Sequence, residues 1–262
     1  MRPAILSLAS GLRLHYAEHG ATGGDAIVFL HGWPDSWFSF SRVAEGLPDE
    51  SRAFLLDQRG FGDSERPDHG YEIRDFAADV AAFLDAVSVE RATVVGHSFG
   101  SFVARQVAIA YPERVDRLVL VGTGWSGSNA VTREVYASLS DLTDPVPREF
   151  AREFQASTAY APLPEPFFDR IIAESLKLPA RLWREILGAV IRYDDTKDLN
   201  EMKTPTVLLW GDRDALFSRA DQDQLVAAIP NARLRIYPEI GHCPNWECPS
   251  LVAADLRAFM AE

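Results

Sequence analysis

The stretch TVVGHSFGSFV, residues 93–103, decides the fold, because it joins an apolar run directly to a helical pattern through a serine between two glycines. The pattern is Gly-x-Ser-x-Gly at Gly96, Ser98 and Gly100. Side chains at either glycine would clash because the turn is tight. This turn raises the serine hydroxyl above a sheet and exposes the Phe99 N–H at a helix N-terminus. Ser98 is either a nucleophile or a small polar residue in a connection, and the flanking strand and helix favour a nucleophile.

Short apolar runs on both sides of this turn predict the strands of one sheet. They lie at residues 26–32, 52–60, 92–98, 116–124, 206–214 and 232–242. Helical patterns alternate with these runs, as at 71–87, where apolar residues recur three and four positions apart. This alternation indicates an α/β fold, with a mostly parallel sheet of about eight strands and helices on both faces. Residues 5–20 are typical of an antiparallel hairpin on the sheet edge.

Residues 125–203 break the alternation, since they contain helical patterns and no convincing strand. About four helices are predicted there, separated by Pro-rich joints. An insertion at the C-terminal edge of a parallel sheet lies over the place where such sheets bind ligands. We therefore predict a core domain formed by residues 1–124 and 204–262, and a helical cap formed by residues 125–203.

Chain order indicates the candidate base and acid, because a serine nucleophile in such a turn precedes its acid and then its histidine. Only His242 follows Ser98 in the chain, in a loop just past the last predicted strand. The acid should lie between them at a strand end, where the sequence offers Asp212 and Asp214. Asp214, deeper in its loop, is favoured as the group that orients the imidazole, and Asp212 is expected to cap the turn.

An oxyanion site needs two N–H donors, each worth about 3 kcal/mol when removed. The Phe99 N–H is one candidate, and the Trp33 N–H, in the loop after the strand at 26–32, is the other. Pro34 has no N–H and fixes the loop. His31 is interpreted as a turn residue that supports this loop.

The composition excludes several other classes of protein. The chain has 262 residues and a formal net charge of -12, and this negative charge argues against a nucleic-acid partner. No apolar run approaches the roughly 20 residues of a membrane span, and the N-terminus does not read as a signal peptide. We expect a cytoplasmic monomer or homodimer. Cys243 and Cys248 are interpreted as free thiols, and no metal or organic cofactor is predicted.

Taken together, these pieces resemble the α/β-hydrolase superfamily over essentially the whole chain. The matching motifs, in the expected order, are HGWP (31–34), DQRGFGDS (57–64), GHSFG (96–100), GDRD (211–214) and GHCPNWECP (241–249). The resemblance implies a Ser98–Asp214–His242 triad, because the second carboxylate of such a GDxD run is usually the catalytic one in the family. It implies a structural turn at 57–64 and no catalytic role for Asp57 or Arg59.

The resemblance leaves the activity within the superfamily open. HGWPDSWFSF is similar to epoxide hydrolases and haloalkane dehalogenases, but those attack with an aspartate where this chain has Ser98. A serine alkoxide suits acyl transfer from an ester, lactone, thioester or amide. We expect a serine esterase or lactonase that acts on a small-molecule substrate. The alternatives are a C–C bond hydrolase, a cofactor-free perhydrolase, and a ligand sensor built on a hydrolase fold.

Aromatic residues are frequent in the predicted cap and loops. An apolar, aromatic-lined cavity under a helical cap would favour a hydrophobic ester or lactone. The residues expected to contact the substrate are Trp33, Phe99, Trp125, Trp183 and Trp246.

Overall fold

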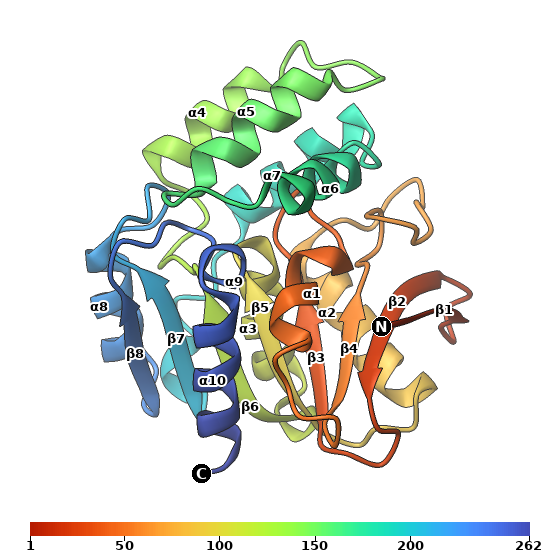
Figure 1. The fold of residues 1–262 in the computed structure, drawn as a ribbon, viewed down its shortest axis with the longest axis vertical. Coiled ribbons are helices and arrows are strands. Elements are labelled where there is room, and N and C mark those ends of the chain that lie inside the picture. The colour runs from red at the N-terminus through yellow and green to blue at the C-terminus, as the bar shows by residue number, and fades with distance from the viewer.

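A single eight-stranded sheet forms the centre of the protein, whose computed structural model describes residues 1–262 (Figure 1). Its order is β1-β2-β4-β3-β5-β6-β7-β8. The strands are β1 (Arg2–Ser7), β2 (Arg13–Gly20), β3 (Ala26–Leu30), β4 (Arg52–Leu56), β5 (Ala92–His97), β6 (Val115–Val121), β7 (Thr206–Gly211) and β8 (Ala232–Tyr237). The predicted α/β class with a mostly parallel sheet is confirmed.

Pairing within the sheet is parallel from β4 through β8 and antiparallel at β1 and β2. The hairpin predicted at residues 5–20 therefore lies on the edge, with its first strand beginning at Arg2. The last predicted strand, 232–242, is shorter in the structure and ends at Tyr237. Residues 238–242 instead form the turn that carries His242 above the sheet.

Helices cover both faces of the sheet. They are α1 (Ser41–Ala44), α2 (Ile73–Ala86), α3 (Phe99–Ala110), α4 (Ala130–Ser138), α5 (Arg148–Thr158), α6 (Glu165–Ser175), α7 (Ala180–Arg192), α8 (Arg219–Ala228), α9 (Pro244–Glu247) and α10 (Pro249–Met260). Three short 3-10 helices are η1 (Trp37–Phe40), η2 (Pro112–Arg114) and η3 (Leu199–Glu201). None of the ten α-helices has the length and apolar content that a membrane crossing needs.

Alternate strand residues point into two separate cores, as the two-residue period of a strand requires. Val94 of β5 packs in the larger core with α2, α3 and α8, while its neighbour Val95 packs in the smaller core with α1 and α10. All six residues of β5 are buried. The central strand thus places the residue that follows it, Ser98, on a rigid support.

Every element between β6 and β7 is helical, and α4 to α7 lie over the carboxyl end of the sheet (Figure 1). A buried ion pair joins this segment to the sheet domain. Arg105 of α3 donates from Nε to Asp195, just after α7, at 2.7 Å, and from Nη1 to the Gly124 carbonyl at 2.7 Å. Both side chains are almost completely buried, so each charge depends on the other for compensation.

Candidate active site

Ser98 lies at the sharp turn between β5 and α3, where its backbone has φ +50° and ψ −117°. This left-handed conformation is unfavourable for a residue with a side chain, and such strain persists only where the surroundings enforce it. The Ser98 N–H donates to the Val121 carbonyl at 2.9 Å, which fixes the turn to the end of β6. The strand-turn-helix context predicted from the sequence is present.

The two glycines that flank Ser98 are required by close backbone contacts. A Cβ at Gly96 would lie 2.2 Å from the Gly100 carbonyl oxygen, and a Cβ at Gly100 would lie 2.2 Å from the Leu30 carbonyl oxygen. Both distances are far below van der Waals contact with backbone atoms that cannot move independently. The turn therefore packs against the end of β3, beside the loop that begins at His31.

His242 and Asp214 are brought together as the chain order suggested. Asp214 Oδ2 lies 2.9 Å from His242 Nδ1, and Asp214 Oδ1 accepts from the N–H groups of Leu216 and Phe217 at 2.8 and 3.0 Å. The carboxylate is thus held on both oxygens, so that it orients the imidazole with the proton on Nδ1. Asp212 instead accepts from the Glu239 N–H at 2.8 Å and stays partly exposed, as a turn cap.

Ser98 and His242 line the same cavity. His242 Nε2 is buried and has no hydrogen-bond partner in the protein, and no hydrogen bond joins it to Ser98 Oγ. Hydrogen bonds of this kind are often long without substrate and tighten when substrate binds. Nε2 is therefore the nitrogen of His242 whose lone pair can still accept a proton.

The two candidate oxyanion donors are also free. Neither the Trp33 N–H nor the Phe99 N–H donates in a hydrogen bond within the protein, and both residues line the cavity. His31 supports the Trp33 loop from behind, because its Nδ1 donates to the Gly32 carbonyl at 2.7 Å and its Nε2 accepts from the Gln58 N–H at 3.2 Å. Burial lowers the pKa of His31 to about 4, so this support stays neutral.

The cavity between the sheet and the cap is narrow, about 40 Å³, and mostly hydrophobic. Its apolar lining includes side chains from α3, α4, α7 and the loop after β7, namely Phe102, Val131, Val135, Leu187, Val190 and Leu216. Its polar lining includes Asp35, Gln155, Thr158 and Cys243. The wall contains no lysine or arginine.

Three of the five residues expected to contact the substrate line this cavity, namely Trp33, Phe99 and Trp246. Trp125 and Trp183 do not. Trp183 is completely buried behind Trp33, with ring centroids 5.1 Å apart, and its Nε1 donates to the Leu178 carbonyl. Trp125 packs against the larger core. In place of these two residues, the wall contains Phe154 of α5 and aliphatic residues of α4 and α7.

Asp35, which the sequence analysis did not single out, lies two residues after Trp33 and is only 2% exposed. Its Oδ1 accepts from Gln155 Nε2 at 2.8 Å and its Oδ2 from Ser39 Oγ at 3.1 Å. Burial raises the pKa of Asp35 to about 6, although these two hydrogen bonds oppose the shift. The side chain was missed because its partner on α5 is distant in sequence and no motif marks it.

The loop that carries His242 is attached to the cap. Glu247 accepts from the N–H groups of Gly241 and Cys243 on either side of the histidine, at 3.0 and 3.3 Å. The same carboxylate accepts from the N–H groups of Tyr160 and Ala161, just after α5, at 3.0 and 2.8 Å. The His242 N–H also donates to the carbonyl of residue 158 at 2.9 Å. One carboxylate thus ties the cap to the histidine loop.

One cluster outside the cavity has the residue types of a metal site, namely His15, Asp57 and Asp63. Its groups are already occupied. His15 Nδ1 lies 2.8 Å from Asp57 Oδ2, the Asp57 oxygens accept from the N–H groups of Trp37 and Asp63, and Asp63 pairs with Lys177 at 2.8 Å. These bonds give the cluster a structural role in the turn at 57–64.

Comparison with known proteins places this chain in one family, whose similar members are named for different activities. Residues 25–249 match the family model described as alpha/beta hydrolase fold. The chain is 25% identical to Epoxide hydrolase 4 of Mus musculus over 97% of this chain and 77% of that protein. It is 30% identical to the 2-hydroxy-6-oxononadienedioate/2-hydroxy-6-oxononatrienedioate hydrolase of Paraburkholderia phymatum, over 93% and 89%. Its structure superposes on an esterase from Exiguobacterium antarcticum with a TM-score of 0.90, at 20% identity over 99% of both chains.

Proposed function

We propose that this chain, which belongs to the α/β-hydrolase family, is a serine hydrolase that cleaves a small, mainly apolar carboxylic ester or lactone. The observation that carries the proposal is the contact of Asp214 with His242, which lines the same cavity as Ser98. Ser98 in its strained turn, His242 with its unpartnered Nε2, and Trp33 and Phe99 with their unpaired backbone N–H groups all line that cavity. These are the parts that acyl transfer through a serine requires.

The reaction follows from the positions of these groups. Ser98 Oγ attacks the carbonyl carbon while His242 Nε2 takes its proton, and Asp214 stabilises the imidazolium. The N–H groups of Trp33 and Phe99 donate to the developing oxyanion. The imidazolium then protonates the leaving alcohol, and an acyl-enzyme remains on Ser98. His242 next removes a proton from water, which attacks the acyl-enzyme and releases the acid.

Features of the site favour this activity over those named for two relatives. Epoxide hydrolases are expected to open the epoxide with an aspartate that forms an alkyl ester, whereas this chain has Ser98 at the nucleophile position. The substrate named for the Paraburkholderia phymatum relative is a dioate, which carries two carboxylates. The cavity wall of this chain has no lysine or arginine to pair with a carboxylate, and it does contain Asp35. A neutral ester therefore fits this cavity better.

The proposal is tested by labelling and turnover measured together. Wild type, Ser98→Ala and His242→Ala are exposed to an organophosphonate and weighed by intact-protein mass spectrometry, and turnover of aryl, alkyl and lactone esters is measured. We expect one adduct and multiple turnovers for wild type, and neither for Ser98→Ala. A folded wild type that forms no adduct would contradict the triad. An adduct without ester turnover would favour the C–C hydrolase or sensor alternative.

A further inference from the structure

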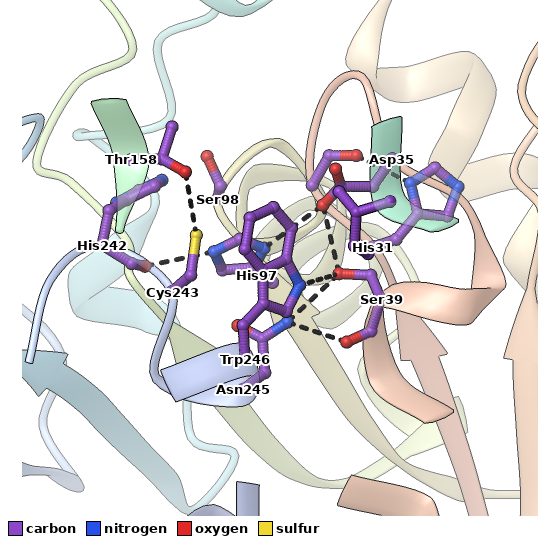
Figure 2. Close-up of polar contacts among 12 residues, drawn as sticks. His31, Asp35, Ser39, His97, Ser98, Thr158, His242, Cys243, Asn245 and Trp246 are labelled. Carbon is purple, nitrogen blue, oxygen red and sulfur yellow. Dashed lines mark hydrogen bonds and ion pairs between the residues drawn. The ribbon is translucent and has the colours of Figure 1, made fainter. Parts of the chain in front are cut away.

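The wall of the cavity that contains the candidate nucleophile also contains a carboxylate, which has no part in the proposed reaction. Asp35 follows Trp33 in the loop after β3, is 2% exposed, and lines the same cavity as Ser98. Figure 2 shows His97 between Asp35 on one side and His242 on the other. Any substrate bound at Ser98 therefore lies in a cavity that contains this carboxyl group.

The hydrogen-bond network around Asp35 is arranged to favour its charged form. Ser39 Oγ receives hydrogen bonds from Trp246 Nε1 at 2.8 Å and from Asn245 Nδ2 at 3.1 Å (Figure 2). Because an indole N–H can only donate, the Ser39 oxygen must accept there, and its own proton is free for Asp35. Gln155 Nε2 supplies a second donor to Asp35. Two donors on one carboxyl group stabilise the carboxylate.

The third neighbour of Asp35 does not neutralise it. His97 Nε2 lies 3.2 Å from the His242 carbonyl, which can only accept, so the proton is on Nε2 and Nδ1 carries a lone pair. This Nδ1 is buried without a partner, 3.9 Å from Asp35 Oδ2. Burial, reinforced by the adjacent His242, keeps the pKa of His97 well below its ordinary value, so the ring is neutral. Two acceptors therefore face each other.

No cation on the cavity wall compensates for this arrangement. The wall contains neither lysine nor arginine, and Asp35 is its one acidic residue. The buried guanidinium of Arg105 is paired with Asp195 and does not line the cavity. A carboxylate on the substrate would have to be desolvated and placed close to a like charge, whereas an ammonium group on the substrate would be attracted to the carboxylate of Asp35.

We propose that Asp35 determines substrate specificity by excluding anionic substrates from the cavity and favouring neutral or ammonium-bearing esters. This inference rests on the hydrolase activity proposed above and names the substrate class for the same site. Asp35 acts on the charge of the substrate rather than on the reacting bond. Its removal should therefore change the ratio of rates between substrates of different charge.

The test compares three phenyl esters that differ only at the end of the acyl chain, namely hexanoate, the adipate half-ester and 6-aminohexanoate. A second series places the charge on the leaving group, with acetate esters of 4-cresol, 4-hydroxybenzoate and 4-hydroxybenzylamine. For wild type we expect kcat/KM for the anionic member of at least one series to be about a hundredfold below that of the neutral member. Asp35→Asn should reduce that ratio at least about tenfold and should lower the preference for the ammonium member.

Control variants separate charge from folding. Asp141→Asn, an exposed position on the cap, should leave every ratio unchanged. Asp35→Ala is measured beside Asp35→Asn, because an amide cannot accept from both Gln155 and Ser39. Circular dichroism and phosphonate labelling of Ser98 identify the folded samples. If both Asp35 variants misfold, the wild-type series decides, and equal rates for anionic and neutral esters in both series overturn the proposal.

The outcomes also distinguish this inference from the proposed function. If neutral esters turn over and Asp35→Asn leaves the anionic-to-neutral ratio unchanged in both series, the specificity role is wrong and the hydrolase activity stands. If no ester turns over, the hydrolase proposal fails. The rates of Ser98 labelling by a neutral and by a carboxylate-bearing phosphonate then measure the same discrimination, and equal labelling rates in wild type overturn the role of Asp35.

Discussion

Replacing Asp214 by Asn should abolish most of the activity while leaving the fold intact, and the structure explains why. Asp214 Oδ1 accepts from the N–H groups of Leu216 and Phe217. In the Asn variant these donors hold the amide oxygen, so the NH2 group must face His242 Nδ1. An amide N–H there donates to Nδ1 and places the imidazole proton on Nε2. His242 then has no lone pair for the proton of Ser98.

The size of the effect follows from the loss of the reactive tautomer. A wrong tautomer of this kind lowers kcat about 10⁴-fold in serine triads, which corresponds to about 5.4 kcal/mol of transition-state stabilisation. The matched control is Asp212→Asn, two residues away. Asp212 accepts only from the Glu239 N–H and is partly exposed, so we expect a change in kcat of less than about twofold.

The assay is steady-state turnover of the best neutral ester at neutral pH, with thermal unfolding measured on the same samples. Asp214→Asn should unfold cooperatively and should show a strongly lowered kcat with little change in KM. The role of Asp214 in orienting His242 is refuted if Asp214→Asn keeps more than about a tenth of wild-type kcat. It is equally refuted if Asp212→Asn loses as much activity as Asp214→Asn.

Other predictions concern stability and the cap. Because burial raises the pKa of Asp35 to about 6, the folded state loses stability as pH rises from about 4 to about 6. The free energy of unfolding of Asp35→Asn, measured in urea and taken relative to that of wild type, should therefore rise by about 2 kcal/mol from about pH 4.5 to about pH 7.5. A difference that does not change with pH would contradict this. Arg105→Met should cost about 3–5 kcal/mol in the same assay by leaving Asp195 unpaired, and replacing both residues should restore most of it. Glu247→Gln should lower kcat about tenfold, because the side-chain NH2 group of the variant would place a donor against the backbone N–H donors that hold the His242 loop. An unchanged kcat would mean that the loop is held by other contacts.

The fold and the candidate catalytic residues could be predicted because their signals are local. Gly96, Ser98 and Gly100 lie within one short turn whose close contacts exclude side chains, so the constraint is written in five consecutive residues. The alternation of strands and helices likewise depends on neighbouring residues. The choice of Asp214 over Asp212 used position in the loop, and the structure places Asp214 against His242.

The cavity wall could not be predicted in the same way. Gln155 reaches Asp35 across 120 residues of sequence, and neither residue has a motif that marks the contact. Hydrophobic periodicity shows that one face of a cap helix is buried, but not whether it faces the cavity or another cap helix. Trp183 was expected on the wall as one of the aromatic residues of the predicted cap, and it instead packs against Trp33, where its indole N–H donates to a carbonyl.

The link made by Glu247 has a consequence for protein engineering. Tyr160 and Ala161 belong to the cap, Gly241 and Cys243 flank His242, and one carboxylate holds all four N–H groups. Cap and histidine loop are therefore not independent modules, although they are far apart in the chain. A chimera that exchanges residues 125–203 for the cap of a relative should carry residues 241–247 of the same donor. A chimera that exchanges the cap alone would have a new cavity wall but would lack the contacts between the cap and the loop that position His242.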